Sequence, residues 1–165
     1  MIKTFSLLLL VAALSAFSAS AKTLKVPSDE FAIASIDIPD DWEPEEITNG
    51  VAGNSPDEAV YLAVVAVGSE KGMSAEIDDT FAMLKEHDVT LDEASKKENK
   101  FKINDLEAEE MLYQGKDQDG PTAVSITFVT IKDKIIVLTY WVSTEDEKKH
   151  QEEVGKIVQS LKPAS

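Results

Sequence analysis

The side chains that could do chemistry in this 165-residue chain are mostly carboxylates, because it holds 31 Asp and Glu, two histidines and no cysteine. Without cysteine there is no disulfide, thiol nucleophile or iron–sulfur ligand. His87 lies near the end of a predicted helix, where the helix dipole favours a cation, and His150 lies at the edge of a second helix's apolar face. We interpret both as surface or packing histidines, not as catalytic bases or metal ligands.

Motifs for nucleophilic, zinc-dependent or phosphate-binding chemistry are absent: the sequence has no Gly-x-Ser-x-Gly, His-Glu-x-x-His or glycine-rich phosphate loop. The segment Asp117–Gly120 faintly resembles a calcium loop, but Phe128 stands at position 12, where an EF-hand needs a glutamate. We therefore predict a turn there. The sequence assigns no catalytic residue, no cofactor and no metal-ligand set.

Other binding chemistries stay open. A carboxylate-dependent hydrolase would need two acids held a set distance apart in a cleft. Aromatic side chains could stack on a ligand or pack in the core, which is the more usual role of tryptophan; they are Trp42, Tyr61 and Trp141. Adjacent acidic pairs could gather a weakly bound divalent cation or form a solvated surface; they are Asp40–Asp41, Glu45–Glu46 and Asp78–Asp79.

The charge of the chain restricts its partners. All 16 basic residues are lysines, and the formal net charge is −15. A chain this acidic is repelled by phosphate backbones and by anionic lipid surfaces, which argues against nucleic-acid binding. The absence of arginine also removes the usual bidentate clamp for phosphate or carboxylate groups.

The first 21 residues read as a signal peptide. Lys3 supplies the positive start, Phe5 to Ala16 form an apolar run, and Ala19-Ser20-Ala21 is a small-x-small cleavage site. This run is too short to span a bilayer well. We predict cleavage after Ala21 and a periplasmic or secreted mature chain, residues 22–165, that folds as a single domain without a membrane anchor.

The strongest folding signal is the stretch Thr122–Val142, in which two β-branched runs flank the short charged turn Lys132–Lys134. This pattern predicts an antiparallel hairpin in the middle of the core. Helices are predicted from Ser74 to about Glu86 and from Glu145 to Leu161, the second with a capping box at Thr144–Glu147. Further strands are predicted at Thr23–Val26, Phe31–Ile38, Ile47–Ala52, Ala59–Val67, Phe101–Ile103 and Leu106–Gln114. The fold class is α+β: an antiparallel sheet of about six strands flanked by helices, similar to an α/β/α sandwich.

Three segments carry a family resemblance: Ile36–Trp42, with its strand, proline and tryptophan, the hairpin Ile131–Tyr140, and the closing helix Ile157–Lys162. Together they resemble PsbP-like domains over about Phe31 to Lys162. That group includes the extrinsic photosystem II subunit, a Ran-binding nuclear import factor and bacterial periplasmic proteins of the DcrB type. The resemblance implies an antiparallel sheet flanked by helices, no common reaction, and a role in binding other proteins.

The function expected from the sequence is therefore that of an exported, non-enzymatic accessory or binding protein that acts through protein contacts. The alternative is a periplasmic module that binds a small ligand or a divalent cation. A concave apolar pocket with convergent polar groups would favour the ligand alternative. An acidic surface with one apolar patch would favour the protein partner.

Overall fold

The computed structural model describes residues 20–68 and 70–164. The predicted signal peptide therefore lies outside the described residues, apart from its last two positions. Within the described part, no helix is long and apolar enough to cross a bilayer. The elements in chain order are β1 (Ala21–Val26), β2 (Ala34–Pro39), β3 (Glu45–Ile47), β4 (Gly50–Asn54), β5 (Val60–Val67), α1 (Glu70–Glu86), β6 (Thr90–Ile103), β7 (Leu106–Lys116), β8 (Pro121–Ile131), β9 (Lys134–Ser143), α2 (Glu147–Gln159) and β10 (Lys162–Pro163).

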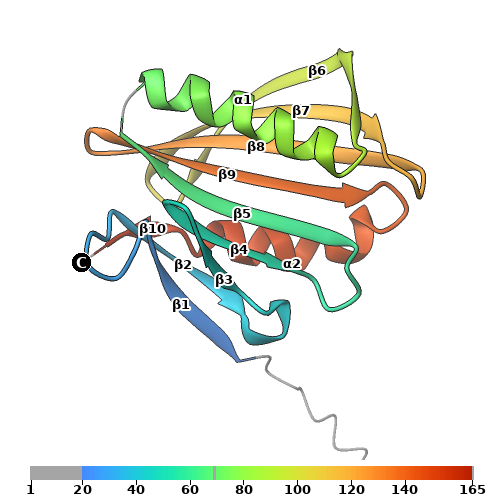
Figure 1. Cartoon of the computed structure of the whole chain (residues 1–165). Coiled ribbons are helices and arrows are strands. Elements are labelled where there is room, and N and C mark those ends of the chain that lie inside the picture. The colour runs from blue at the N-terminus through green and yellow to red at the C-terminus, as the bar shows by residue number, and fades with distance from the viewer. Residues whose placement is uncertain (1–19, 69, 165) are drawn as a thin grey trace, which may run out of the picture.

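The strands form two antiparallel sheets. The main sheet has seven strands in the order β3-β4-β5-β9-β8-β7-β6, and a smaller sheet has the order β1-β2-β10. Helix α1 covers one face of the main sheet, while α2 lies on the opposite side together with the small sheet (Figure 1). The α+β class is confirmed. The expected six strands are too few, because the main sheet has seven and the small sheet was not foreseen as separate.

The predicted hairpin is confirmed as the centre of the main sheet. Strand β9 is the middle strand and β8 is its neighbour, paired from Thr122 with Ser143 to Ile131 with Lys134. Alternate side chains of the two strands enter two different cores: Val124 and Ile126 pack on the α1 side, while Val129 and Ile136 pack on the α2 side. Each such side chain adds about 1.5–3 kcal/mol when fully buried, so the hairpin stabilises both layers.

Both helices differ from their predicted bounds at the N-terminus. Helix α1 begins at Glu70, so Ser74 lies inside the helix and does not cap it; glutamate, lysine and methionine before it are good helix formers. In α2 the N-cap is Asp146, without a side-chain capping bond. The predicted capping box is wrong because the backbone N–H of Thr144 donates to the Pro121 carbonyl, which holds Thr144 at the end of the sheet. The helix ends at Gln159, and Leu161 packs in the core beyond it.

Strand β6 is longer than predicted and starts at Thr90, in the region where the apolar pattern weakens. Its register against β7 shifts between Asp92 and Lys97, which marks a bulge. The hydroxyl of Ser95 pins the bulge, since it donates to the Asp92 carbonyl (2.6 Å) and accepts from the Gln114 backbone N–H (2.8 Å). A bulge breaks the period-two alternation, and for that reason the sequence pattern hid this strand.

The predicted strand Ile47–Ala52 is a hairpin between β3 and β4. The chain turns at Asn49, which has a φ of 58°. Asparagine tolerates this left-handed conformation better than most residues do. The next position requires glycine, because a Cβ on Gly50 would lie 2.1 Å from the Val64 carbonyl oxygen on β5.

The C-terminal end of α2 is fastened by hydrogen bonds to two other parts of the chain. Asn104, in the β6–β7 turn, donates from Nδ2 to the carbonyl oxygens of Gln159 (3.0 Å) and Leu161 (2.9 Å). Ser160 accepts a hydrogen bond from the backbone N–H of Asp37 on β2 (2.8 Å). The last carbonyls of a helix lack partners within it, so these contacts both satisfy the helix end and fix its position.

Replacing Asn104 separates the two roles of this residue. We expect Asn104→Ala to lower the free energy of unfolding by about 2–3 kcal/mol, because it removes two hydrogen bonds and strains a position whose φ is 54°. Asn104→Gly removes the same hydrogen bonds without the steric strain, so it should cost about 1–2 kcal/mol. Urea denaturation measures both. A glycine variant as stable as the wild type would show that the hydrogen bonds to α2 contribute nothing.

Candidate functional site

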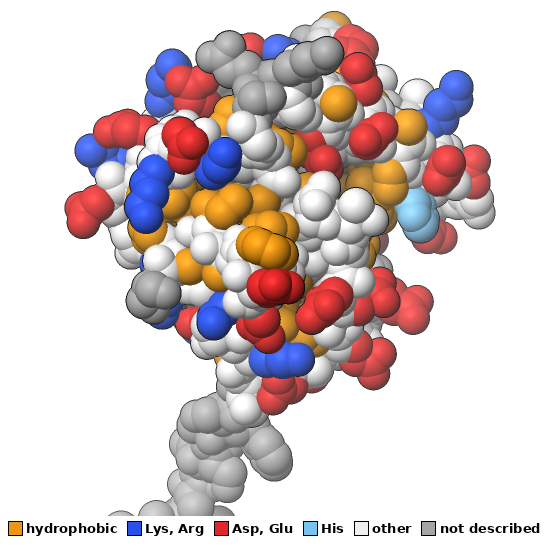
Figure 2. Space-filling model, turned by 60° about the vertical axis from the view of Figure 1, so that its left-hand side comes forward, with side chains coloured by type: hydrophobic (Ala, Val, Ile, Leu, Met, Phe, Trp, Pro, Cys, Tyr) orange, Lys and Arg blue, Asp and Glu red, His pale blue; other side chains and the backbone are white. Residues whose placement is uncertain are grey.

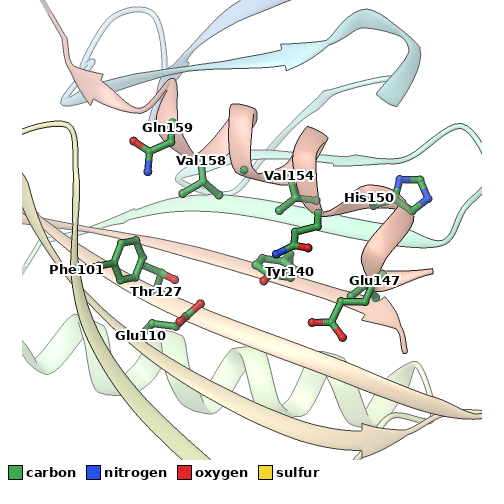
Figure 3. Close-up of a pocket in the computed structure, with 12 residues that line it drawn as sticks. Phe101, Glu110, Thr127, Tyr140, Glu147, His150, Val154, Val158 and Gln159 are labelled. Atoms are coloured by element: carbon green, nitrogen blue, oxygen red, sulfur yellow. The ribbon is translucent and has the colours of Figure 1, made fainter. Parts of the chain in front are cut away.

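A pocket of about 330 Å³ lies between α2 and the sheet face formed by β6 to β9 (Figure 3). Phe101 and Tyr140 give it aromatic walls, and Val154 and Val158 of α2 lie above them. The other lining residues are Glu110, Thr127, Val142, Glu147, His150, Gln151, Gly155 and Gln159. The pocket therefore combines apolar walls with polar groups from both layers, which is typical of small-molecule sites.

The polar floor of the pocket is built around Glu110 on β7. Its Oε1 accepts a hydrogen bond from the Ser125 hydroxyl (2.7 Å), and its Oε2 accepts one from Asn99 Nδ2 (3.0 Å). Asn99 on β6 lies directly opposite Glu110. Ser125 on β8 lies opposite Leu112, two residues along β7 from Glu110 and on the same face. The pleat thus directs Glu110 towards α2, while its neighbour Glu109 pairs with Lys100 in an exposed ion pair on the other face.

Tyr140 adds a neutral hydroxyl to this floor. Burial raises the pKa of Tyr140, and the negative charge of Glu110 raises it further. The phenol therefore stays protonated at neutral pH and can donate a hydrogen bond. Figure 3 shows Glu110 and Tyr140 on the sheet side of the pocket, with Phe101 at one end and Glu147 at the other.

Gly155 leaves space over the pocket. A Cβ built at this helical position meets no atom within 4 Å. Glycine inside a helix costs about 0.5–1 kcal/mol relative to alanine, so the gap in the helix surface is kept at some cost in stability. A larger side chain here would narrow the pocket without displacing a packed neighbour.

The N-terminal end of α2 is held by a side-chain lock, defined here as Ser55, Asp57, Lys149 and His150. Asp57 in the β4–β5 loop accepts from the Ser55 hydroxyl (2.7 Å), lies 3.0 Å from His150 Nε2, and is paired with Lys149. Ser55 and His150 are both buried. The carboxylate stands between the serine and the histidine, so the three are not arranged as a Ser–His–Asp triad, in which the histidine must lie between the other two.

A second concave feature lies on the α1 face, beside the half of α1 that contains Met73 and Ile77. This apolar groove of about 640 Å³ continues over Met111, Phe128 and Ile135 of the sheet. Figure 2, in which the left-hand side of Figure 1 comes forward, shows hydrophobic side chains gathered near the middle of that face, with charged side chains around them. The charged lining residues are Glu98, Lys100, Glu107 and Glu109, together with Glu110, whose carboxylate lies on the other face of the sheet.

Of the three aromatic residues named from the sequence, Tyr61 and Trp141 come together and Trp42 lies apart from them. Tyr61 and Trp141 face each other across β5 and β9 and stack at 4.3 Å between ring centroids, and the His87 ring centroid lies 5.5 Å from that of Trp141. Trp42 is fully buried in the core that contains α2. Its buried Nε1–H has no partner among the described residues. Trp42 is therefore a packing residue and offers no stacking surface.

The other residues considered from the sequence have defined places in the structure. Asp117–Gly120 is a turn, as predicted, because Asp117 Oδ1 accepts from the backbone N–H of Asp119 (2.9 Å) and of Gly120 (3.0 Å). His87 follows the end of α1, and His150 belongs to the lock. Across residues 20–68 and 70–164 no three histidine, aspartate or glutamate side chains come together as a metal would require.

Apart from His150, the sequence did not single out the pocket residues. The sequence places Glu110 in one run of glutamates with Glu107 and Glu109. The period of two does separate Glu110 from the other two, but it does not show which face is covered. Phe101 and Gly155 gave no signal on their own.

Comparison with known proteins supports the fold. No protein-family model matches the sequence, and a search of curated proteins finds no match. Among solved structures, cyanobacterial PsbP (CyanoP) from Synechocystis is similar at a TM-score of 0.59 with 10% identity, covering 94% of this chain and 99% of that one. A Bacteroides thetaiotaomicron structure gives 0.54 with 12% identity, covering 80% of this chain and 45% of that one. The yeast Ran-binding protein Mog1p gives 0.48 with 8% identity, covering 88% and 96%. The expected PsbP-like fold is confirmed.

The lock makes stability depend on pH in the acid range. The Lys149 ammonium, with the Ser55 hydroxyl, holds the pKa of Asp57 well below its ordinary value of 3.8. A lowered folded-state pKa gives stability that is fully present above the ordinary pKa and is lost as the pH falls towards the folded value. We expect Asp57→Asn to be less stable than the wild type at pH 7, and the difference to shrink between about pH 4 and about pH 2.

Urea denaturation at several pH values measures this difference. Asp29→Asn is the matched control, because Asp29 is exposed on the β1–β2 loop. Its difference from the wild type should stay small throughout. A constant difference for Asp57→Asn across the acid range would show that the lock does not titrate.

Proposed function

We propose that this chain is an exported, non-catalytic accessory protein that binds a protein partner through the groove beside α1 and needs no cofactor. The groove carries the proposal. Its lining includes two methionines, and flexible methionine side chains adapt well to a partner's apolar surface. The resemblance to PsbP-like domains supports the same class of function, because it implies protein contacts and no shared reaction.

The chemistry of the groove defines the partner's contact surface. Met73, Ile77 and Phe128 offer an apolar floor. Around it stand three glutamates whose side chains lie on this face, and each is paired with a lysine: Glu98 with Lys96, Glu107 with Lys102 and Glu109 with Lys100. The complementary surface is an apolar side chain or helix face with a polar rim that can contact these exposed ion pairs.

A double substitution in α1 tests the groove. Met73→Gln with Ile77→Gln keeps residues that suit a helix but makes the floor polar. The wild type is expected to retain a partner protein from an envelope extract of the native cells. We expect the amount of that partner retained by the variant to be at least about tenfold lower, which is the loss expected when a buried anchor contact is removed. Quantitative mass spectrometry of the retained proteins measures the change.

Phe31→Gln is the matched control, because Phe31 is 68% exposed on the β1–β2 loop, outside the groove. It should retain the same protein as the wild type. Equal retention by all three proteins would show that the groove is not the contact surface.

Export is tested separately. We expect the intact mass of the protein recovered outside the cytoplasm to match residues 22–165, since Ala19-Ser20-Ala21 is the predicted cleavage site. A blocked-cleavage variant, Ala21→Glu, should accumulate with residues 1–21 attached. Recovery of only the full-length wild-type chain in the cytoplasm would contradict the export proposal.

A further inference from the structure

We propose that the pocket beneath α2 binds a small organic amine, with the ammonium group held by Glu110 and the apolar body held by Phe101, Tyr140 and Val158. This site lies on the opposite face of the sheet from the groove beside α1. It is a second binding site that does not depend on the protein-partner proposal.

The charge of the pocket selects a cation. Its lining contains the carboxylates Glu110 and Glu147 and no lysine. Within the described part of the chain neither carboxylate forms an ion pair, whereas Glu98, Glu107, Glu109 and Glu152 on the exposed surface each pair with a lysine. An anionic ligand would be repelled from this space, and a neutral ligand would leave both charges unbalanced.

The geometry around Glu110 leaves room for an ammonium group. A carboxylate has about four lone-pair positions, and Ser125 and Asn99 occupy one on each oxygen. These two bonds fix the carboxylate in place and leave further positions free. An ammonium has three donors and no acceptor, so it matches a fixed carboxylate that still accepts.

The walls of the pocket select the rest of the ligand. Phe101 and Tyr140 are half-buried aromatic rings, and a cation near the face of an aromatic ring is attracted by its quadrupole. Val142 and Val154 close the apolar side towards the core. The volume of about 330 Å³ lies at the small end of the range for ligand pockets, so the body of the amine is a short alkyl chain or a single ring.

Calorimetry with n-pentylamine at pH 7 tests the proposal, with 1-pentanol as the neutral compound of the same shape. We expect the amine to bind and the alcohol to bind at least about tenfold more weakly. Glu110→Gln should weaken amine binding by about 10- to 100-fold, the loss expected for a charged hydrogen bond. Glu152→Gln is the matched control, because this glutamate lies on the exposed side of α2 in an ion pair with Lys156, outside the pocket, and its variant should bind like the wild type.

A second variant keeps the test decisive if Glu110→Gln is unstable. Gly155→Leu extends a side chain into the space over the pocket from a position where a Cβ meets no atom within 4 Å, so it should fold normally and lose amine binding. Chemical-shift changes of the Phe101 and Tyr140 rings on titration locate the bound amine. The proposal is overturned if the wild type binds no amine, if the alcohol binds equally well, or if neither Glu110→Gln nor Gly155→Leu weakens binding.

Discussion

The structure depends on keeping both faces of its central strands away from water. Strands β5, β8 and β9 carry apolar side chains on both faces of the sheet, so neither face can be left exposed to water. Helix α1 covers one face, and the other needs α2 and the small sheet together. The small sheet is made from both ends of the described chain, since β10 near the C-terminus pairs with β2. One requirement, burial of the β8–β9 hairpin, thus organises the positions of the helices and both ends of the fold.

The attachment of α2 explains why a pocket survives beneath it. A helix held only by its apolar stripe would settle onto the sheet until its side chains filled the space. Here polar contacts fix both ends of α2: Asp57 holds His150 and Lys149 at the start, and Asn104 holds the carbonyls of Gln159 and Leu161 at the finish. Between these ends, Gly155 contributes no side chain. The helix therefore bridges the space, and the fixed ends keep the distance between Val158 and the floor.

Much of the fold could be predicted from residue patterns, because those patterns reflect burial. The β8–β9 hairpin, β5 and the apolar face of α2 follow directly from their periodicity. Strand β6 could not be predicted at its start, because the bulge at Ser95 interrupts the alternation. The pocket could not be predicted at all. The alternation places Glu109 and Glu110 on opposite faces without showing which face a helix covers, and the Asp57–His150 contact joins residues 93 positions apart. Which glutamate faces a helix is decided by packing between layers, not by the strand itself.

The bulge of β6 also determines how the sheet ends. Strand β6 forms one edge of the main sheet, and a strand of 14 residues with an open edge would be a template on which another chain could add. The bulge at Ser95 twists this edge, and Lys96, Lys97, Lys100 and Lys102 place charges along it. At the opposite edge, β3 has only three residues. Both margins of the sheet are thus unsuited to strand addition, so molecules of this protein can be crowded together while their sheets remain separate.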